Sequence, residues 1–269
     1  MGPLRPKKEK EMKKKVSVAD MVLLSAFTSI IIILAFVPQI GFITLPGVSL
    51  TTIHIPVLIG IMILKPRYAL TLGIIFGLVS MSVSFMRATN PVDVAFQNPL
   101  VSVLPRALFG VIAWAIFYGF NQLSKLKFGS KLQFGIVAII TVLALYFGMI
   151  AFVEIVAPDL ENSTMIGGSI GLLLAILMII GYYIANLKRE TDILSVPATM
   201  IIATLAHTAL VLTALVVFGN LGHLFGDNIV GAIYGMVTVN GLLEALLAVF
   251  IGTPIYVALK RGNLLNQGK

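Results

Sequence analysis

Hydrophobic stretches alternate with short polar gaps along almost the whole chain. They run near residues 17–37, 52–64, 69–86, 99–122, 131–157, 166–187, 196–218 and 228–259. A helix needs about 20 residues to cross ~30 Å of hydrocarbon, and most of these stretches suffice. The stretch 52–64 is shorter, and such a segment is tolerated at membrane depth only where protein buries it or where it lines a cavity. The pattern predicts an all-α integral membrane protein, a bundle of about eight transmembrane helices.

The basic residues indicate how these helices are oriented. Except for Arg87 and Arg106, all Lys and Arg residues lie in alternate gaps between the hydrophobic stretches. These gaps are the first fifteen residues, 65–67, 125–131, 188–189 and 260–269. Because Lys and Arg are retained on the cytoplasmic side of a membrane, we expect both termini inside the cell and an even number of crossings.

Composition supports a membrane location. Hydrophobic residues make up 58% of the chain and charged residues 11%, against roughly 25% charged in soluble domains. The net charge of +8 does not predict nucleic-acid binding, because seven of the basic residues precede the first helix, where such clusters fix topology and contact anionic lipid. We therefore expect a multi-pass protein of the cell membrane, with the lipid bilayer and not nucleic acid as its surroundings.

The chain is expected to form one membrane-embedded unit. Residues 1–16 would be a basic cytoplasmic tail, 17–261 the transmembrane domain and 262–269 a second cytoplasmic tail. Two external connections, 38–51 and 87–98, are the richest in Pro, Asn and Thr. We expect both to be loops that fold over the same outer opening.

Polar residues that interrupt apolar helices are the candidates for function, because they are costly in a membrane and usually face a cavity or the bundle interior. Asn240 and Glu244 are four residues apart in the last helix, so they lie on one face. Gly241 beside them allows close approach of a ligand or a backbone. The pair predicts either a ligand-contacting wall or an interhelical hydrogen-bond pair that only holds helices together.

A second group of candidate residues consists of two arginines near the start of the fourth hydrophobic stretch. Arg106 follows Asn98-Pro99 in the sequence and lies roughly 10 Å below the helix start at 1.5 Å per residue. With Arg87 it could hold a carboxylate or phosphate of a ligand. The alternative is a salt bridge from Arg106 or Arg87 to Asp93.

The histidines are weaker candidates. His54 opens the short second stretch and could hydrogen bond a ligand, whereas His207 could pair with Glu244 across helices. With His223, they lie in separate elements without metal-ligand spacing, and the absence of Cys excludes a thiolate metal site. No phosphate-binding Gly-Lys-Ser/Thr loop or nucleophile motif is present. We expect no metal, no cofactor and no enzymatic activity.

The first helix carries small residues at helical spacing. Ser25 and Ser29, with Ala26 between them, match the small-xxx-small pattern that permits close helix approach. The pattern predicts packing within the bundle or docking of a second membrane subunit.

Several segments resemble the substrate-binding S components of energy-coupling factor (ECF) transporters. The stretch 51–60, Thr-Thr-Ile-His-Ile-Pro-Val-Leu-Ile-Gly, leads to Lys65-Pro66-Arg67-Tyr68-Ala69, where the family has a Gly-Pro-x-x-Gly turn and this chain lacks both glycines. The runs 98–106 and 240–244 are similar to the family's Asn-Pro…Pro-Arg and Asn-Gly…Glu signatures. The resemblance covers a six-helix core at 17–122 and 196–261. Residues 131–190 look like an inserted helix pair.

The resemblance implies a high-affinity binding subunit for a water-soluble vitamin. It would work with a membrane scaffold (T) subunit and two cytoplasmic ATPase subunits, and Ser25, Ala26 and Ser29 would meet the scaffold. The substrate-binding residues expected here are His54, Arg87, Asn98, Arg106, Asn240 and Glu244. Pantothenate is the first substrate candidate, because the arginines could take its carboxylate; riboflavin and a cobalamin-type ligand stay open.

Two other functional classes fit parts of the sequence. A proton-coupled secondary transporter would use Glu244 and His207 as a relay, and its transport would persist without an ATPase partner. An integral-membrane enzyme would form product as a purified chain. Both are disfavoured because Glu244 is the only acidic residue deep within a predicted span.

Overall fold

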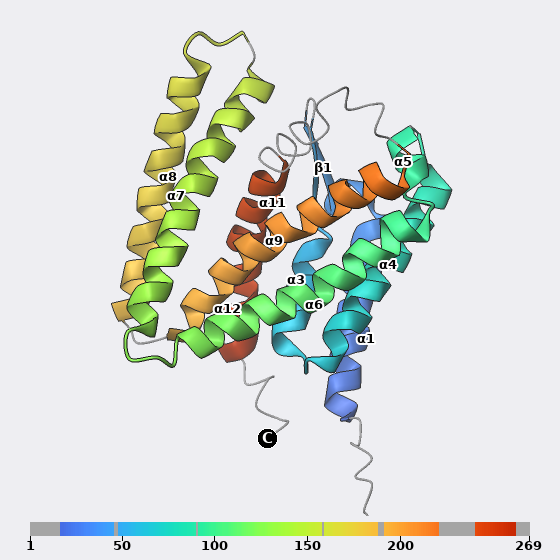
Figure 1. Cartoon of the computed structure of the whole chain (residues 1–269), viewed down its shortest axis with the longest axis horizontal. Coiled ribbons are helices and arrows are strands. Elements are labelled where there is room, and N and C mark those ends of the chain that lie inside the picture. Colours follow the sequence, from blue (N-terminus) through green and yellow to red (C-terminus); the bar gives the residue numbers. More distant parts are fainter. Residues whose placement is uncertain are drawn as a thin grey trace, which may run out of the picture.

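The fold is a bundle of long helices with a small hairpin at one end (Figure 1). The computed structural model describes residues 17–45, 48–89, 91–157, 159–187, 191–220 and 240–261. Its elements are α1 (Val18–Phe36), α2 (Pro38–Gly41), β1 (Phe42–Leu45), β2 (Val48–Thr51), α3 (His54–Ile63), α4 (Arg67–Arg87), α5 (Pro91–Ala95), α6 (Pro99–Leu123), α7 (Gly129–Val156), α8 (Ser163–Leu187), α9 (Thr191–Phe218), α11 (Leu242–Leu247), the π-helix η3 (Ala248–Gly252) and α12 (Thr253–Arg261).

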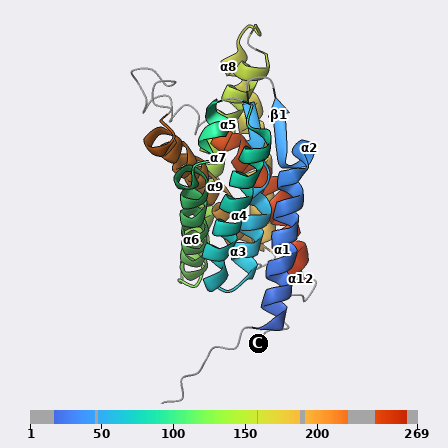
Figure 2. The same cartoon turned by 90° about the vertical axis from the view of Figure 1, so that its right-hand side faces the viewer.

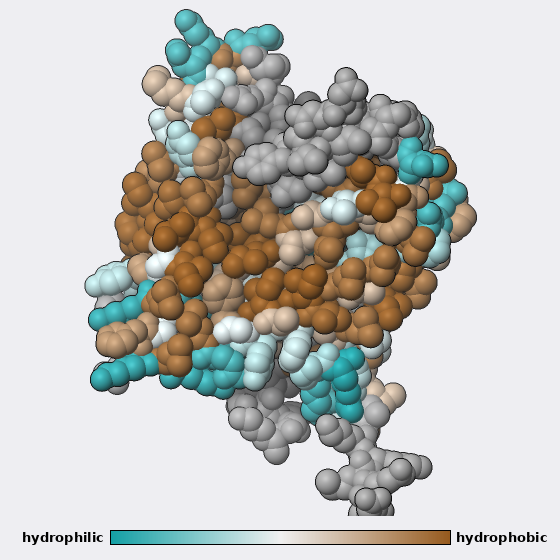
Figure 3. All heavy atoms as spheres, in the orientation of Figure 1, coloured by the Kyte–Doolittle hydropathy of each residue, from teal (hydrophilic) through white to brown (hydrophobic). Residues whose placement is uncertain are grey.

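Within the described residues, seven helical stretches are long and apolar enough to cross a membrane. The eighth predicted stretch is α3, which has only 10 residues. A broad hydrophobic band covers the face shown in Figure 3, with hydrophilic residues along its lower edge. The prediction of an all-α membrane fold is confirmed. The first part of the last predicted stretch, 228–239, lies outside the described residues.

The connection 38–51 differs from the expected loop. It contains the short helix α2 and an antiparallel hairpin, in which Phe42 pairs with Thr51 and Leu45 with Val48. The two strands flank Pro46 and Gly47 in the sequence. Pro-Gly marks a turn, and the runs on either side of it are apolar and β-branched, as is typical of strands. The hairpin therefore has a signal in the sequence. In Figure 2, β1 lies at the end of the bundle opposite the start of α1.

Helix α3 lies at the centre of the core. Nine of its ten residues, all except Ile63, are buried, including Leu58 and Ile61. Side chains from α1, α4, α6, α9 and η3 belong to the same buried hydrophobic cluster. A helix that is apolar all round must be surrounded by protein or lipid, and the cluster explains why so short a segment is stable at membrane depth.

Glycines bring α4 and α6 into close contact. A Cβ added at Gly73 would lie 2.3 Å from the carbonyl oxygen of Arg106, and one at Gly77 would lie 2.6 Å from Cα of Val103. Small residues at such crossings allow backbones to approach closely. These glycines therefore pack the bundle and place the α4 side chains next to Arg106.

The last helix is not regular. Between α11 and α12, η3 inserts a π-helical turn directly before Pro254. Proline lacks the N–H of a regular helix, and π-helices occur mostly as single turns inserted in α-helices. A Cβ at Gly252 would lie 2.6 Å from Cε of Met200, so the irregular turn also packs closely on α9.

Helices α7 and α8 stand together at one edge of the molecule, away from α1 and α4 (Figure 1). They pack through glycines: a Cβ at Gly171 would lie 2.4 Å from the carbonyl oxygen of Leu145. Gln133 of α7 donates to Ser195 of α9 at 2.7 Å. The pair is therefore attached to the rest of the bundle largely through α7.

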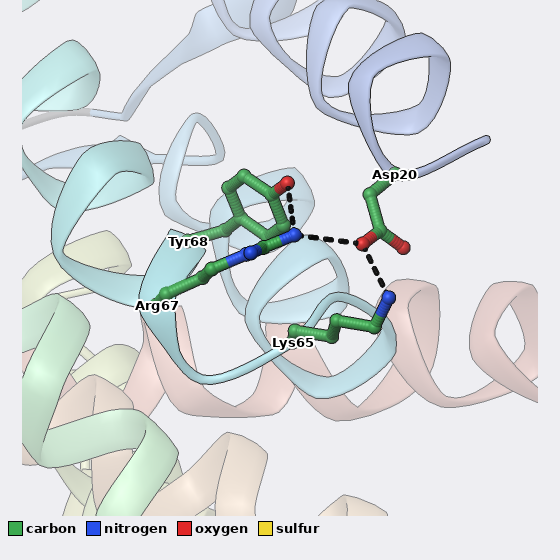
Figure 4. A network of polar contacts seen from close by, with 4 residues as sticks. All are labelled: Asp20, Lys65, Arg67 and Tyr68. Atoms are coloured by element: carbon green, nitrogen blue, oxygen red, sulfur yellow. Dashed lines mark hydrogen bonds and ion pairs between the residues drawn. The ribbon is translucent and has the colours of Figure 1, made fainter. Parts of the chain in front are cut away.

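At the end of the bundle where α1 begins, ion pairs hold this helix to the turn between α3 and α4. Lys65 Nζ lies 2.7 Å and Arg67 Nη2 3.3 Å from the same oxygen of Asp20. Arg67 also donates to the Tyr68 hydroxyl at 2.9 Å. Figure 4 shows the four side chains converging. Exposed pairs add little stability, but this network ties the first turn of α1 to its neighbours.

Candidate functional site

A cavity of about 530 Å³ lies between the hairpin, α4, α5, α6, α9 and the start of α11. Its wall is largely apolar. The charged and amide side chains that line it are Arg87, Asp93, Arg106, Asn240 and Glu244. A concave, mostly apolar site with a few fixed polar groups is the usual build of a small-molecule site.

Arg106 is positioned by its own helix. Pro105 has no N–H, so the carbonyl of Val101 loses its regular helical partner. The Arg106 side chain turns back and replaces it: Nη1 donates to Val101 at 2.9 Å and to the Ser102 carbonyl at 3.2 Å. Pro105 therefore removes one backbone hydrogen bond of the helix, and the side chain of Arg106 replaces it.

The guanidinium of Arg106 is held among aromatic rings. Its Cζ lies 4.8 Å from the ring centroid of Phe96 and 5.6 Å from that of Phe76. The residue is only 6% exposed, and Nε has no hydrogen-bond partner among the described residues. A buried guanidinium has five donors in a fixed fork, and part of this fork is unused. The arrangement can receive a carboxylate or phosphate.

Glu244 also lines the cavity, and its carboxylate joins three elements of the structure. It is 6% exposed. One carboxylate oxygen accepts the backbone N–H of Thr51 at 2.8 Å, and the other accepts from the Thr208 hydroxyl at 3.1 Å. The carboxylate thus connects β2, α9 and α11. Each of its oxygens accepts one hydrogen bond from the protein, whereas Nε of Arg106 makes none among the described residues.

Asn240 and Arg87 lie nearer the rim. Asn240, just before α11, is partly exposed and lines the cavity with Glu244. Arg87 is exposed at the end of α4, and its Nη2 donates to the carbonyl of Phe36 at 2.6 Å. These two therefore share one cavity with Arg106 and Glu244, although they come from three distant parts of the sequence.

His207 faces the cavity, which sequence reasoning did not predict. It is 5% exposed, and neither ring nitrogen has a hydrogen-bond partner among the described residues. The expected hydrogen bond to Glu244 is therefore not formed, and that carboxylate accepts from Thr51 and Thr208 instead. His207, Thr208 and Val211 of α9 all line the cavity, a placement that depends on how α9 packs and not on a pattern in its sequence.

Two of the expected ligand contacts lie behind the cavity wall or away from it. His54 is fully buried and stacks on His207, with ring centroids 5.9 Å apart. Asn98 caps α6 by accepting the Leu100 N–H at 2.9 Å, and it donates to the carbonyl of Phe218 at 3.2 Å. Neither is among the residues that line the cavity. His54 packs against His207, which does line it.

The residues expected to dock a partner lie on the outer face of α1. Ser25, Ala26 and Ser29 are all exposed. The Ser25 hydroxyl donates to the Val22 carbonyl and the Ser29 hydroxyl to the Ser25 carbonyl, both at 2.9 Å. The side chains on this face are thus small, and their hydroxyl groups donate to carbonyls of the same helix. Such a face permits close packing against another membrane helix.

In the part of the chain that the structure describes, no group of three or more His, Cys, Asp or Glu side chains could hold a metal ion. A family model described as "ECF transporter, substrate-specific component" matches residues 19–167. No curated protein matches the chain. The match continues through α7 into α8 and ends before α9, so it does not stop at the expected insertion. The division into a six-helix core and an inserted pair stays a prediction.

Proposed function

Because this chain belongs to the family of ECF transporter substrate-specific components, we propose that its cavity binds a small acidic vitamin, with pantothenate as the first candidate. The chain is a membrane-embedded, multi-pass substrate-binding subunit of an ECF transporter. Transport subunits of this family work with a scaffold subunit and ATPase subunits, and the chain has no ATP-binding loop of its own.

Arg106 is the observation that supports an acidic ligand. It is a buried cation with unused donors in a cavity whose wall is largely apolar. Leaving donors of such a group unused at membrane depth is costly, and a ligand carboxylate would accept from them in charge-assisted hydrogen bonds. Arg87 at the rim adds a second positive charge along the entry side.

The size of the cavity supports a small vitamin. At about 530 Å³ it lies in the ordinary range for ligands of drug-like size. Pantothenate and riboflavin are molecules of that class. A corrinoid, with its macrocycle and attached nucleotide, is far larger than this space, so the cobalamin-type ligand is the least favoured of the three.

The test compares two ligands that differ in one charge. Binding of pantothenate and of its uncharged alcohol, pantothenol, is measured by isothermal titration on the purified chain. Arg106→Gln is expected to weaken pantothenate binding about tenfold or more, since a charged hydrogen bond contributes about 1.5–3 kcal/mol and 1.4 kcal/mol is tenfold. Pantothenol binding should change little.

Two further variants sharpen this result. Arg106→Lys keeps the charge and should recover part of the affinity, whereas Lys131→Gln removes an exposed cation of α7 and should change nothing. Equal losses for both ligands in Arg106→Gln would contradict the carboxylate assignment. Mass spectrometry of molecules that co-purify with the unmodified chain identifies the ligand independently.

We also propose that the Ser25–Ser29 face of α1 contacts the scaffold subunit, with both chain termini in the cytoplasm and two ATPase subunits completing the complex. Ala26→Leu places bulk on this face and should reduce co-purification of the scaffold severalfold. Gly181→Leu is the matched control, because an added Cβ there meets nothing within 4 Å. Retention of the scaffold by Ala26→Leu would exclude this face.

A further inference from the structure

We propose that His207 is the second ligand-recognition group of the cavity and hydrogen bonds an uncharged hydroxyl or amide of the ligand. This inference rests on the proposed binding function and extends it. Arg106 would set the requirement for an anionic group, and His207 would set the requirement for a polar group elsewhere on the same molecule.

The first argument is the missing partner. A neutral imidazole has one donor and one acceptor, and buried polar side chains almost always have hydrogen-bond partners. His207 has neither group satisfied by the described residues, although it is buried in the middle of a membrane helix. The most obvious structural partner, Glu244, accepts from Thr51 and Thr208 and makes no hydrogen bond to His207. A ligand in the cavity can supply what the protein does not.

The second argument is preorganisation. Three rings surround the imidazole, with centroids at 4.8 Å for Phe109, 5.4 Å for Phe76 and 5.9 Å for His54. These rings restrict how the imidazole can rotate, while its residue lines the cavity. A recognition group held in place by packing loses little conformational freedom on binding. An apolar side chain would pack equally well here, so packing alone does not explain a histidine.

The third argument is the position of His207 relative to Arg106. Both side chains lie against the ring of Phe76, with the imidazole centroid at 5.4 Å and the guanidinium carbon at 5.6 Å from its centroid. One small ligand can therefore reach both groups. A hydroxyl suits the imidazole best, because it can accept from the ring N–H or donate to the other nitrogen.

The experiment uses two ligands and the full chain. One is pantothenate; the other is an N-acyl-β-alanine with the same carbon skeleton but without the two hydroxyl groups. The unmodified chain should bind pantothenate about tenfold more tightly, because the second ligand leaves His207 unpaired. In His207→Phe and His207→Leu, affinity for pantothenate should fall about tenfold and the preference between the two ligands should disappear.

Other variants separate His207 from Arg106 and from a general loss of structure. Arg106→Gln should weaken both ligands by the same factor, since both carry the carboxylate. Thr199→Val changes another buried polar side chain of α9, one that bonds the carbonyl of Ser195 and does not line the cavity. It should leave both the affinities and the preference unchanged.

A measurement without ligand tests the same idea independently of which vitamin is bound. If His207 is kept for the ligand, replacing it removes an unsatisfied buried group, and the melting temperature of the ligand-free chain should rise by roughly 2–4 °C in His207→Phe or His207→Leu. A fall in both variants, or a persistent preference for pantothenate, would overturn the inference. If the unmodified chain binds neither ligand but the melting temperature rises, the pantothenate assignment fails and the role of His207 stands.

Discussion

The core around α3 and the pair α7–α8 use the same apolar residues and the same glycine contacts, but they differ in what they bury. The core buries Arg106, Glu244, His54 and His207. The pair buries only uncharged polar groups among its described side chains, such as Gln133 and Thr141. Burying charge in a membrane is costly. The difference therefore separates the region that we propose binds the ligand from one whose described contacts are explained by packing.

The largest effect expected is an all-or-none labelling result that tests whether the pair crosses the membrane like the core. The chain contains no Cys, so Leu160→Cys and Leu126→Cys each introduce a single thiol at an exposed position. A membrane-impermeant maleimide added to intact cells should label position 160 and not 126. Labelling of 126 alone would invert the proposed orientation, and the cavity would then open toward the cytoplasm.

A smaller effect is expected from adding one methyl group at matching glycines. Gly73→Ala and Gly171→Ala each place a Cβ within 2.4 Å of a backbone oxygen, and such overpacking costs about 1–3 kcal/mol. Both should lower the melting temperature of the chain. Only Gly73→Ala should also weaken pantothenate binding, because it pushes α4 away from Arg106. Equal effects on binding would mean that the pair also shapes the cavity.

The third comparison removes one buried polar side chain in each region, and the variant of Gln133 is expected to have the smallest effect of all. Glu244→Leu removes the acceptor of the Thr51 N–H and should cost about 1.5–3 kcal/mol of stability, with faster hydrogen exchange at that amide. Gln133→Leu removes one bond to Ser195, but it also removes a carbonyl oxygen without a partner among the described residues. We expect its effect to stay within about 1 kcal/mol. A larger effect for Gln133→Leu would contradict this comparison.

The helices could be predicted because the length of an apolar run is a local property of the sequence. The predicted stretches agree with α4, α6 and α8 to within a few residues at each end, since a membrane requires long apolar runs and excludes charges from them. The hairpin was missed although its sequence carries a Pro-Gly break between apolar runs, because the connection was assigned by composition alone. The π-helical turn η3, which precedes Pro254 and packs on Met200 of α9, was not predicted within the apolar run 228–259.

Part of the candidate site could also be predicted. Arg87, Arg106, Asn240 and Glu244 share one cavity as expected, because charged and amide groups within apolar helices are rare enough to stand out. His54 was favoured over His207 for its place at a helix start, yet the cavity is lined by His207. Which of two buried histidines faces a cavity depends on how α3 and α9 pack together. Their own sequences do not contain that information.

By itself, the sequence determined that this chain is a multi-pass membrane protein and pointed to its family, because hydrophobic length and motif order are properties of the chain alone. Only the tertiary structure decided which polar groups meet. The carboxylate of Glu244 contacts Thr51, 193 positions away in the sequence, and the guanidinium of Arg106 lies against a ring from α4. Such contacts depend on helix crossing and side-chain direction, which a linear pattern does not record.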